Sequence, residues 1–229
     1  TNLDDSPLAR MMFVIYINQS DQPKYDSRKI EIRLQKAGRL WSEKLRDSLT
    51  KQMGDESRIL YIVQKYGDAF PIGYRETYKP KQSIYDIEKI EDVLFTNRLA
   101  LDLYHDNDCD DNQLRLKVYH PNAPMTLSAA LPILENMGMQ VIAEKPFEVR
   151  PEGEKKPVWI HDFTLEREKN ATVITIKDVK ENFEEALIRA WYGEVENDTL
   201  NRLVLSAKMN WREIMILRSY VHYMRQMRY

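Results

Sequence analysis

The chain has 229 residues, of which 43% are hydrophobic, and this is enough apolar material for the core of one large or two small domains. Its 34 basic and 36 acidic residues give a net charge of −2, which argues against nucleic acid or an anionic membrane as a partner. The single cysteine, Cys109, cannot form an internal disulfide or a cysteine-based zinc site, so a cytoplasmic location is expected.

The chain opens with a short apolar run at residues 9–18 that contains β-branched and aromatic residues. Such a run predicts a buried strand. Its apolar part, 11–17, is far shorter than the about 20 residues that cross a membrane, so no membrane partner is expected. The chain starts without methionine and stops within a helical pattern, from which we expect a segment of a larger protein.

Helices are predicted next. Apolar residues three and four positions apart predict a helix over residues 27–53, capped by Asp26 or Ser27 and ended by Gly54. A second, shorter helix ends at Gly67, and weak helical character continues to about residue 95. We assign residues 1–95 to a strand of a preceding domain plus a helical linker region.

The middle of the chain alternates between apolar and polar residues. The stretches 98–104 and 114–119 each place leucine or valine at every second position, which predicts two strands of an antiparallel hairpin. The inward residues are Leu99, Leu101, Leu103, Leu114, Leu116 and Val118. A polar loop, 106–112, connects the two strands.

A helix from Leu127 to Met137 follows, capped by Thr126 and ended by Gly138 in a left-handed conformation. The later elements are two strands, a short third strand, and a helix that opens with a capping box and ends at Gly193. Their predicted ranges are 139–149, 158–165 and 173–176 for the strands, and Asp178 with Glu181 for the capping box.

This order predicts an α+β fold. Residues 96–193 contain a β-α-β-β-α unit with an antiparallel sheet and helices on one face, the pattern of small ferredoxin-like regulatory domains. Helical segments flank this unit. The last of them, 194–229, contains a helix capped by Asn210 and Glu213.

Several kinds of active site are excluded by the residue pattern. The seven glycines are too scattered for a dinucleotide-binding or phosphate-binding loop, and a serine nucleophile motif is missing. His161 and Asp162 point to opposite faces of a strand, which favours a structural histidine over a general base. His105 with the aspartates of the following loop is a weak candidate for a hard cation, and a solvated turn is favoured.

Long colinear stretches resemble one family, the large bacterial NAD-specific glutamate dehydrogenases. The segment 66–76 (YGDAFPIGYRE) resembles the "aFPxxYRE" segment of that family, and 125–138 (MTLSAALPILENMG) resembles its "LSxxLPxLENMG" segment. The stretch 114–119 before this segment, and the stretches 158–163, 201–205, 210–213 and 217–220 after it, add to the resemblance in the same order.

The resemblance implies an ACT-like domain with flanking helices, upstream of a dehydrogenase core in the same polypeptide. It also implies that NAD and the catalytic lysine belong to that core, so no catalytic, cofactor-binding or metal residue is assigned here. The parent protein would oxidise glutamate to 2-oxoglutarate and ammonia. A homo-oligomer is expected.

Three readings of the function remain open: a non-catalytic scaffold, an allosteric module that binds an amino acid effector, and an independent enzyme. For the second, backbone donors before a helix N-terminus favour a carboxylate in the loop between residues 120 and 127. The candidate effector-binding residues are His120, Asn122, Thr126, Leu127 and Ser128.

Overall fold

The structure of the protein is a computed structural model, and it describes residues 26, 28–30, 40–105, 112–167 and 175–227. The chain divides into two compact units, 1–39 and 40–229. In the first unit, the carboxylate of Asp26 accepts hydrogen bonds from the backbone N–H groups of Arg28 and Lys29, so the predicted cap is confirmed. The strand predicted at 9–18 lies outside the described residues.

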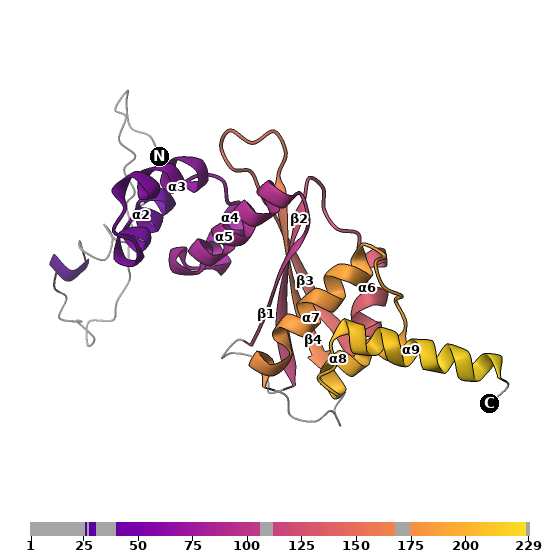
Figure 1. The fold of residues 1–229 in the computed structure, drawn as a ribbon. Coiled ribbons are helices and arrows are strands. Elements are labelled where there is room, and N and C mark those ends of the chain that lie inside the picture. The colour runs from indigo at the N-terminus through magenta and orange to yellow at the C-terminus, as the bar shows by residue number, and fades with distance from the viewer. Residues whose placement is uncertain (1–25, 27, 31–39, 106–111, 168–174, 228–229) are drawn as a thin grey trace, which may run out of the picture. The chain divides into compact units, whose positions relative to one another are not determined.

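Four helices begin the second unit (Figure 1). They are α2 (Trp41–Gln52), α3 (Glu56–Tyr66), α4 (Ile72–Thr77) and α5 (Pro80–Thr96). One continuous helix over 27–53 is wrong, because Leu40 has extended backbone (φ −60°, ψ 149°) and is the N-cap of α2. The spacing of apolar residues does not reveal such a break in a helix. The sequence signal for it is Gly38, shortly before Leu40, because glycine has low helix propensity.

Helix α5 is longer and more regular than the sequence pattern predicted. Helical character up to about residue 95 is confirmed, but it is not weak, since α5 is a helix of 17 residues. Pro80 occupies its first position and Asn97 ends it in the left-handed conformation (φ 51°). Gly67 is the C-cap of α3, as predicted.

The sheet has four antiparallel strands in the order β1-β2-β4-β3. The elements from β1 to α7 are β1 (Ala100–Tyr104), β2 (Gln113–Pro121), α6 (Leu127–Asn136), β3 (Met139–Val149), β4 (Val158–Arg167) and α7 (Ile176–Trp191). Strands β2, β3 and β4 with helices α6 and α7 form the predicted β-α-β-β-α unit, and β1 adds an edge strand beside β2. Gly138 follows α6 with φ 82°, as predicted.

The start of α7 differs from the prediction. Thr175 is its N-cap, so the capping box at Asp178 and Glu181 is wrong. Ile176 is the first helical residue, and the rest of the strand predicted at 173–176 is outside the described part apart from Thr175. The physical reason is the helical spacing of Ile176 with Val179, since both side chains pack on the core under α7.

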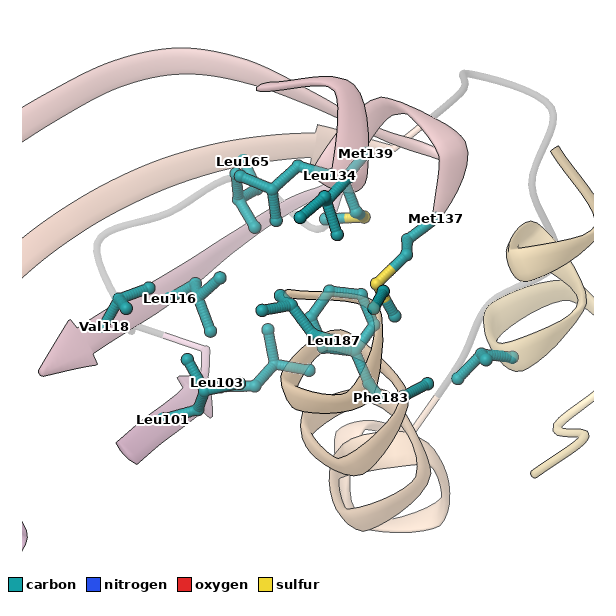
Figure 2. Packing of buried hydrophobic residues seen from close by; sticks show 14 of the residues in the cluster. Leu101, Leu103, Leu116, Val118, Leu134, Met137, Met139, Leu165, Phe183 and Leu187 are labelled. Atoms are coloured by element: carbon teal, nitrogen blue, oxygen red, sulfur yellow. The ribbon is translucent and has the colours of Figure 1, made fainter. Parts of the chain in front are cut away.

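Helices α6 and α7 cover one face of the sheet. The alternating leucines and valine of β1 and β2 meet Leu134 of α6 and Phe183 and Leu187 of α7 in one apolar core (Figure 2). This core contains all six residues predicted to point inward. The predicted antiparallel pairing of these two strands is confirmed, and the structure places Leu103 opposite Leu116 and Leu101 opposite Val118.

The opposite face of the sheet is also covered, although the sequence pattern predicted helices on one face only. A second core joins Tyr119, Phe147 and Ile160 of the sheet to helices α2 to α5. The prediction of helices on one face of the sheet therefore holds for the β-α-β-β-α unit. When α2 to α5 are included, helices cover both faces.

After α7, the chain continues through a 3-10 turn (Thr199–Arg202), α8 (Leu203–Ser206) and α9 (Trp211–Gln226). Asn210 and Glu213 form the predicted capping box of α9. In the described part of the chain, the helices are too short or too polar to cross a membrane.

Candidate functional site

The most unusual group of side chains lies on the second face of the sheet. On β2, Arg115, Lys117 and Tyr119 alternate with the predicted inward residues and so point away from α6 and α7. Lys117 is only 5% exposed and Tyr119 is fully buried. Because lysine is almost never buried unless it is paired, this position requires a partner.

The partner of Lys117 is Asp86, which lies on the inward side of α5 and is 1% exposed. The Nζ atom of Lys117 lies 2.9 Å from Oδ1 and 2.7 Å from Oδ2 of Asp86. The Tyr119 hydroxyl donates to Oδ1 at 2.6 Å, and the Tyr74 hydroxyl donates to Oδ2. Four donor contacts therefore fill the roughly four acceptor sites of this carboxylate.

Aromatic rings complete the environment of the Lys117 ammonium group. It lies 4.0 Å from the ring centroid of Tyr78 and 6.0 Å from those of Tyr74 and Tyr104. A cation over an aromatic face is stabilised by the ring quadrupole, more strongly where water is excluded. The rings thus offset part of the desolvation of Lys117.

Asp162 of β4 forms the second half of the cluster and is 1% exposed. Its Oδ2 accepts hydrogen bonds from Tyr78 and Arg115, and Arg115 also donates to the Thr164 hydroxyl at 2.7 Å. Asp162 Oδ1 and Arg115 Nε are buried and have no hydrogen-bond partner among the described residues. The polar atoms around Asp162 therefore have fewer of their possible hydrogen bonds than those around Asp86.

The tyrosines of the cluster act as hydrogen-bond donors. Burial, together with the negative charge of Asp86, raises the pKa of Tyr74 and Tyr119 well above its usual value. Burial and Asp162 raise the pKa of Tyr78 in the same way. Burial opposes ionisation of Arg115, but the neighbouring Asp162 carboxylate raises its pKa. We name these residues the α5–sheet clamp: Asp86, Lys117, Tyr74, Tyr119, Tyr78, Asp162 and Arg115.

His161 lies on the other face of β4 from Asp162, as the alternation predicted, and is 2% exposed. Its Nε2 accepts the Met125 N–H at 2.9 Å, so Nδ1 carries the proton and donates to Glu144 at 2.7 Å. Burial lowers the pKa of His161, although Glu144 opposes this shift. The residue is thus a buried structural histidine that fixes the backbone immediately before α6.

The candidate effector residues are only partly brought together. Thr126, Leu127 and Ser128 form the start of α6, and the Thr126 side chain makes no capping hydrogen bond. The side chains of His120 and Asn122 are engaged elsewhere: His120 Nδ1 lies 2.8 Å from the Ala123 carbonyl oxygen, and the Asn122 amide donates to Asn97.

The described residues form neither a metal site nor a glycine-rich dinucleotide loop. Within the described residues, no group of three histidine, cysteine or acidic side chains could hold a metal ion, and the loop after His105 lies largely outside them. None of the described glycines lies between a strand and the start of a following helix, where a dinucleotide phosphate would sit. The described glycines therefore do not form a dinucleotide phosphate-binding loop.

The chain matches three sequence families of glutamate dehydrogenase in chain order. Residues 48–93 match helical motif 2, residues 98–179 match the ACT3 domain, and residues 195–229 match helical motif 3. The α5–sheet clamp therefore joins residues from the first of these regions to residues from the second.

Three curated relatives are each called NAD-specific glutamate dehydrogenase. The protein from Halomonas elongata is 36% identical over 229 residues, and the one from Pseudomonas aeruginosa is 30% identical over 228, both covering 100% of this chain. The protein from Mycobacterium tuberculosis is 28% identical over 243 residues, covering 98% of it. The chain spans 14% of the length of each relative.

Proposed function

This chain belongs to the glutamate dehydrogenase family, and from that premise we propose that it is a non-catalytic scaffolding and regulatory segment of an NAD-dependent enzyme. The full-length protein would oxidise L-glutamate to 2-oxoglutarate and ammonia, with NAD and the catalytic groups held by a downstream core of the same polypeptide. We further place this protein in the cytoplasm as a homo-oligomer.

The observation that carries the proposal is the α5–sheet clamp. Asp86 and Lys117 are both buried, and each forms its charge pair with the other within the protein. A catalytic acid or base must reach the reacting atom of a substrate, whereas a buried and paired group holds two elements together. The clamp thus supports a mechanical role, fixing α5 on the sheet.

Further contacts support the same role along the segment. Backbone N–H groups of Arg150 and Glu152 donate to the carbonyl oxygens of Ala69 and Lys65, which ties the β3–β4 turn to the end of α3 and the residues after it. At the other end, Arg218 of α9 is 4% exposed and donates to Asp198 and Asn201. We propose functional boundaries at residues 1–95, 96–193 and 194–229, with the clamp spanning the first two.

The test is turnover by the full-length protein with the clamp replaced by apolar residues. In the double variant Asp86→Leu/Lys117→Met, we expect glutamate-dependent NADH formation to stay within about threefold of the natural protein, since buried pairs are often replaceable by apolar residues. If either residue performed chemistry, turnover would fall by roughly a thousandfold or more. Absence of glutamate oxidation by the natural full-length protein would contradict the proposed activity.

A second candidate function is an amino-acid-binding allosteric sensor. It is favoured by the start of α6, where the Thr126 side chain makes no capping bond and Leu127 and Ser128 are exposed. Backbone N–H groups at a helix N-terminus attract a carboxylate. His120 and Asn122 would contribute only after leaving their present partners, Ala123 and Asn97.

Calorimetric titration with amino acids tests this alternative. Leu127→Pro removes one backbone donor at a position where proline is tolerated, and Leu127→Ala is the matched control that keeps the donor. Heat of binding that Leu127→Pro abolishes and Leu127→Ala preserves would support the sensor. Absence of heat at millimolar ligand would remove it.

A further inference from the structure

Helix α9 carries two apolar faces, and only one of them packs against other described residues of the protein. Ile214 is 1% exposed, and Leu217 and Val221 are half-buried on the same side of the helix. This side also contains buried Arg218, which anchors the helix. In Figure 1, α9 runs outward from α7 and α8, so most of its length extends beyond these helices.

The second face is exposed along the helix. We call it the α9 stripe, and its residues are Ile216 (54% exposed), Tyr220 (64%), Tyr223 (61%), Met224 (53%) and Met227 (57%). Among the described residues, none covers it.

The spacing of the α9 stripe is the spacing of a helix-packing seam. Ile216, Tyr220, Tyr223 and Met227 follow one another at intervals of four, three and four residues. This is the pattern by which one helix presents a continuous apolar row to another helix. A solvated helix face would instead carry charged residues at these positions.

The residue types indicate a protein partner. Tyrosine and methionine are enriched in the cores of protein–protein interfaces, and charged residues are depleted there. The stripe follows this rule, since its five members are uncharged. Arg218, the charged residue nearest in sequence to Tyr220, points to the opposite side of the helix and is buried. A strongly charged partner, such as nucleic acid, has nothing to recognise on this face.

The area of the stripe decides between two occupants. With about 200 Å² for each large side chain, the exposed fractions correspond to roughly 600 Å². A stable interface between separate molecules needs about 800 Å² per partner, so this stripe alone is too small to hold a second copy of the chain. A helix tethered in the same polypeptide faces a much smaller entropic penalty, because its effective concentration is high.

We propose that the α9 stripe is the docking seam for a helix that lies outside this segment in the same full-length polypeptide. The partner helix presents an uncharged apolar row of matching spacing. This inference rests on the proposed function, since the relatives contain this region as only 14% of their length. Through α9, the segment would then be mechanically continuous with another part of the enzyme.

Site-specific photocross-linking in the full-length protein tests the proposal. A benzophenone amino acid replaces Tyr223 in one variant and Met224 in a second, so that one failed substitution does not end the experiment. His222 is the matched control, because it is an exposed aromatic residue about 100° around the helix from Tyr223. Mixing isotopically labelled and unlabelled protein before irradiation separates cross-links within one polypeptide from those between two.

The expected result is a cross-link from Tyr223 and Met224, but not from His222, to a helix of the same polypeptide outside this segment. Cross-links that join labelled to unlabelled chains through α9 would overturn the proposal, as would the absence of any cross-link at both stripe positions. The readout does not depend on turnover, so a full-length protein without glutamate oxidation would defeat the proposed function alone.

Discussion

The Nζ atom of Lys117 lies 2.7 Å from Oδ2 of Asp86. Both residues are buried, with Lys117 5% and Asp86 1% exposed. The two residues are 31 positions apart in the sequence and belong to different elements, the central strand β2 and helix α5. Taking either charge out of water is unfavourable by several kcal/mol unless its partner is in place. Packing of α5 on the sheet is therefore coupled to formation of this pair.

Removal of the carboxylate should destabilise the protein strongly. In Asp86→Ala, the Lys117 ammonium group remains buried without its charge partner, and we expect the free energy of unfolding to fall by about 3–5 kcal/mol. Denaturant titration followed by circular dichroism measures this change. The comparison variant is Asp86→Leu/Lys117→Met, which removes both charges and should recover the part of the loss that comes from the unpaired Lys117 charge, while the Tyr74 and Tyr119 hydroxyls still lack their acceptor. A double variant as unstable as the single one would contradict the unpaired charge as a cause of the loss.

Acid should weaken the protein through His161. Burial lowers the pKa of His161 below its ordinary value of 6.5, so the unfolded chain binds this proton more readily than the folded chain. The stability from this group is complete above the unfolded pKa and is lost as the pH falls. Between about pH 7 and about pH 5, the natural chain should therefore lose stability relative to His161→Gln, measured by chemical denaturation. A constant difference across this range would contradict the assignment of a neutral buried imidazole.

Arg218 should hold α9 to the preceding turn. It donates from Nε to Asp198 at 2.7 Å and from Nη2 to Asn201 at 2.9 Å. Because Asp198 is partly exposed, we expect Arg218→Ala to weaken local stability by about 2 kcal/mol, less than full loss of a buried pair. Hydrogen exchange should accelerate in α9 and remain slow in the sheet. The exposed Arg212→Ala is the control, and an equal acceleration there would argue against a specific anchor.

Three glycine variants distinguish the effect of a left-handed backbone conformation from the effect of steric contact with an added Cβ atom. Gly138 and Gly153 both have φ of +82°, whereas a Cβ at Gly54 would meet nothing within 4 Å and needs no left-handed backbone. We expect Gly138→Ala and Gly153→Ala each to lose about 1–2 kcal/mol in stability, and Gly54→Ala to be close to neutral. A Cβ at Gly138 would lie 3.4 Å from the Arg202 Cβ, so a much larger loss at Gly138 would show that this contact cannot adjust.

The sheet was predictable because alternation reports which side of a strand faces a core. Leu101, Leu103, Leu116 and Val118 follow that rule, and all lie under α6 and α7. Alternation also places Lys117 on the opposite face of the sheet, but it does not indicate whether that face is exposed to solvent. Lysine at such a position is usually solvated, so burial of Lys117 follows only from the packing of α5.

The candidate site was harder to predict because its members are distant in sequence. Asp86 and Tyr74 come from helical segments whose sequence gave weak signals, and they meet Lys117 only in the folded protein. The available signal was the aromatic-rich segment 66–76, which contains Tyr74. Local motifs pointed instead to the residues from His120 to Ser128, where the start of α6 was visible from capping chemistry alone.

NAD binding by the isolated 229-residue chain and by the full-length protein, measured side by side by calorimetry, tests the central claim most directly. We predict binding by the full-length protein, together with glutamate-dependent NADH formation, and neither property in the isolated chain. Stoichiometric NAD binding or NADH formation by the isolated chain would contradict the claim that this segment supports the chemistry without performing it.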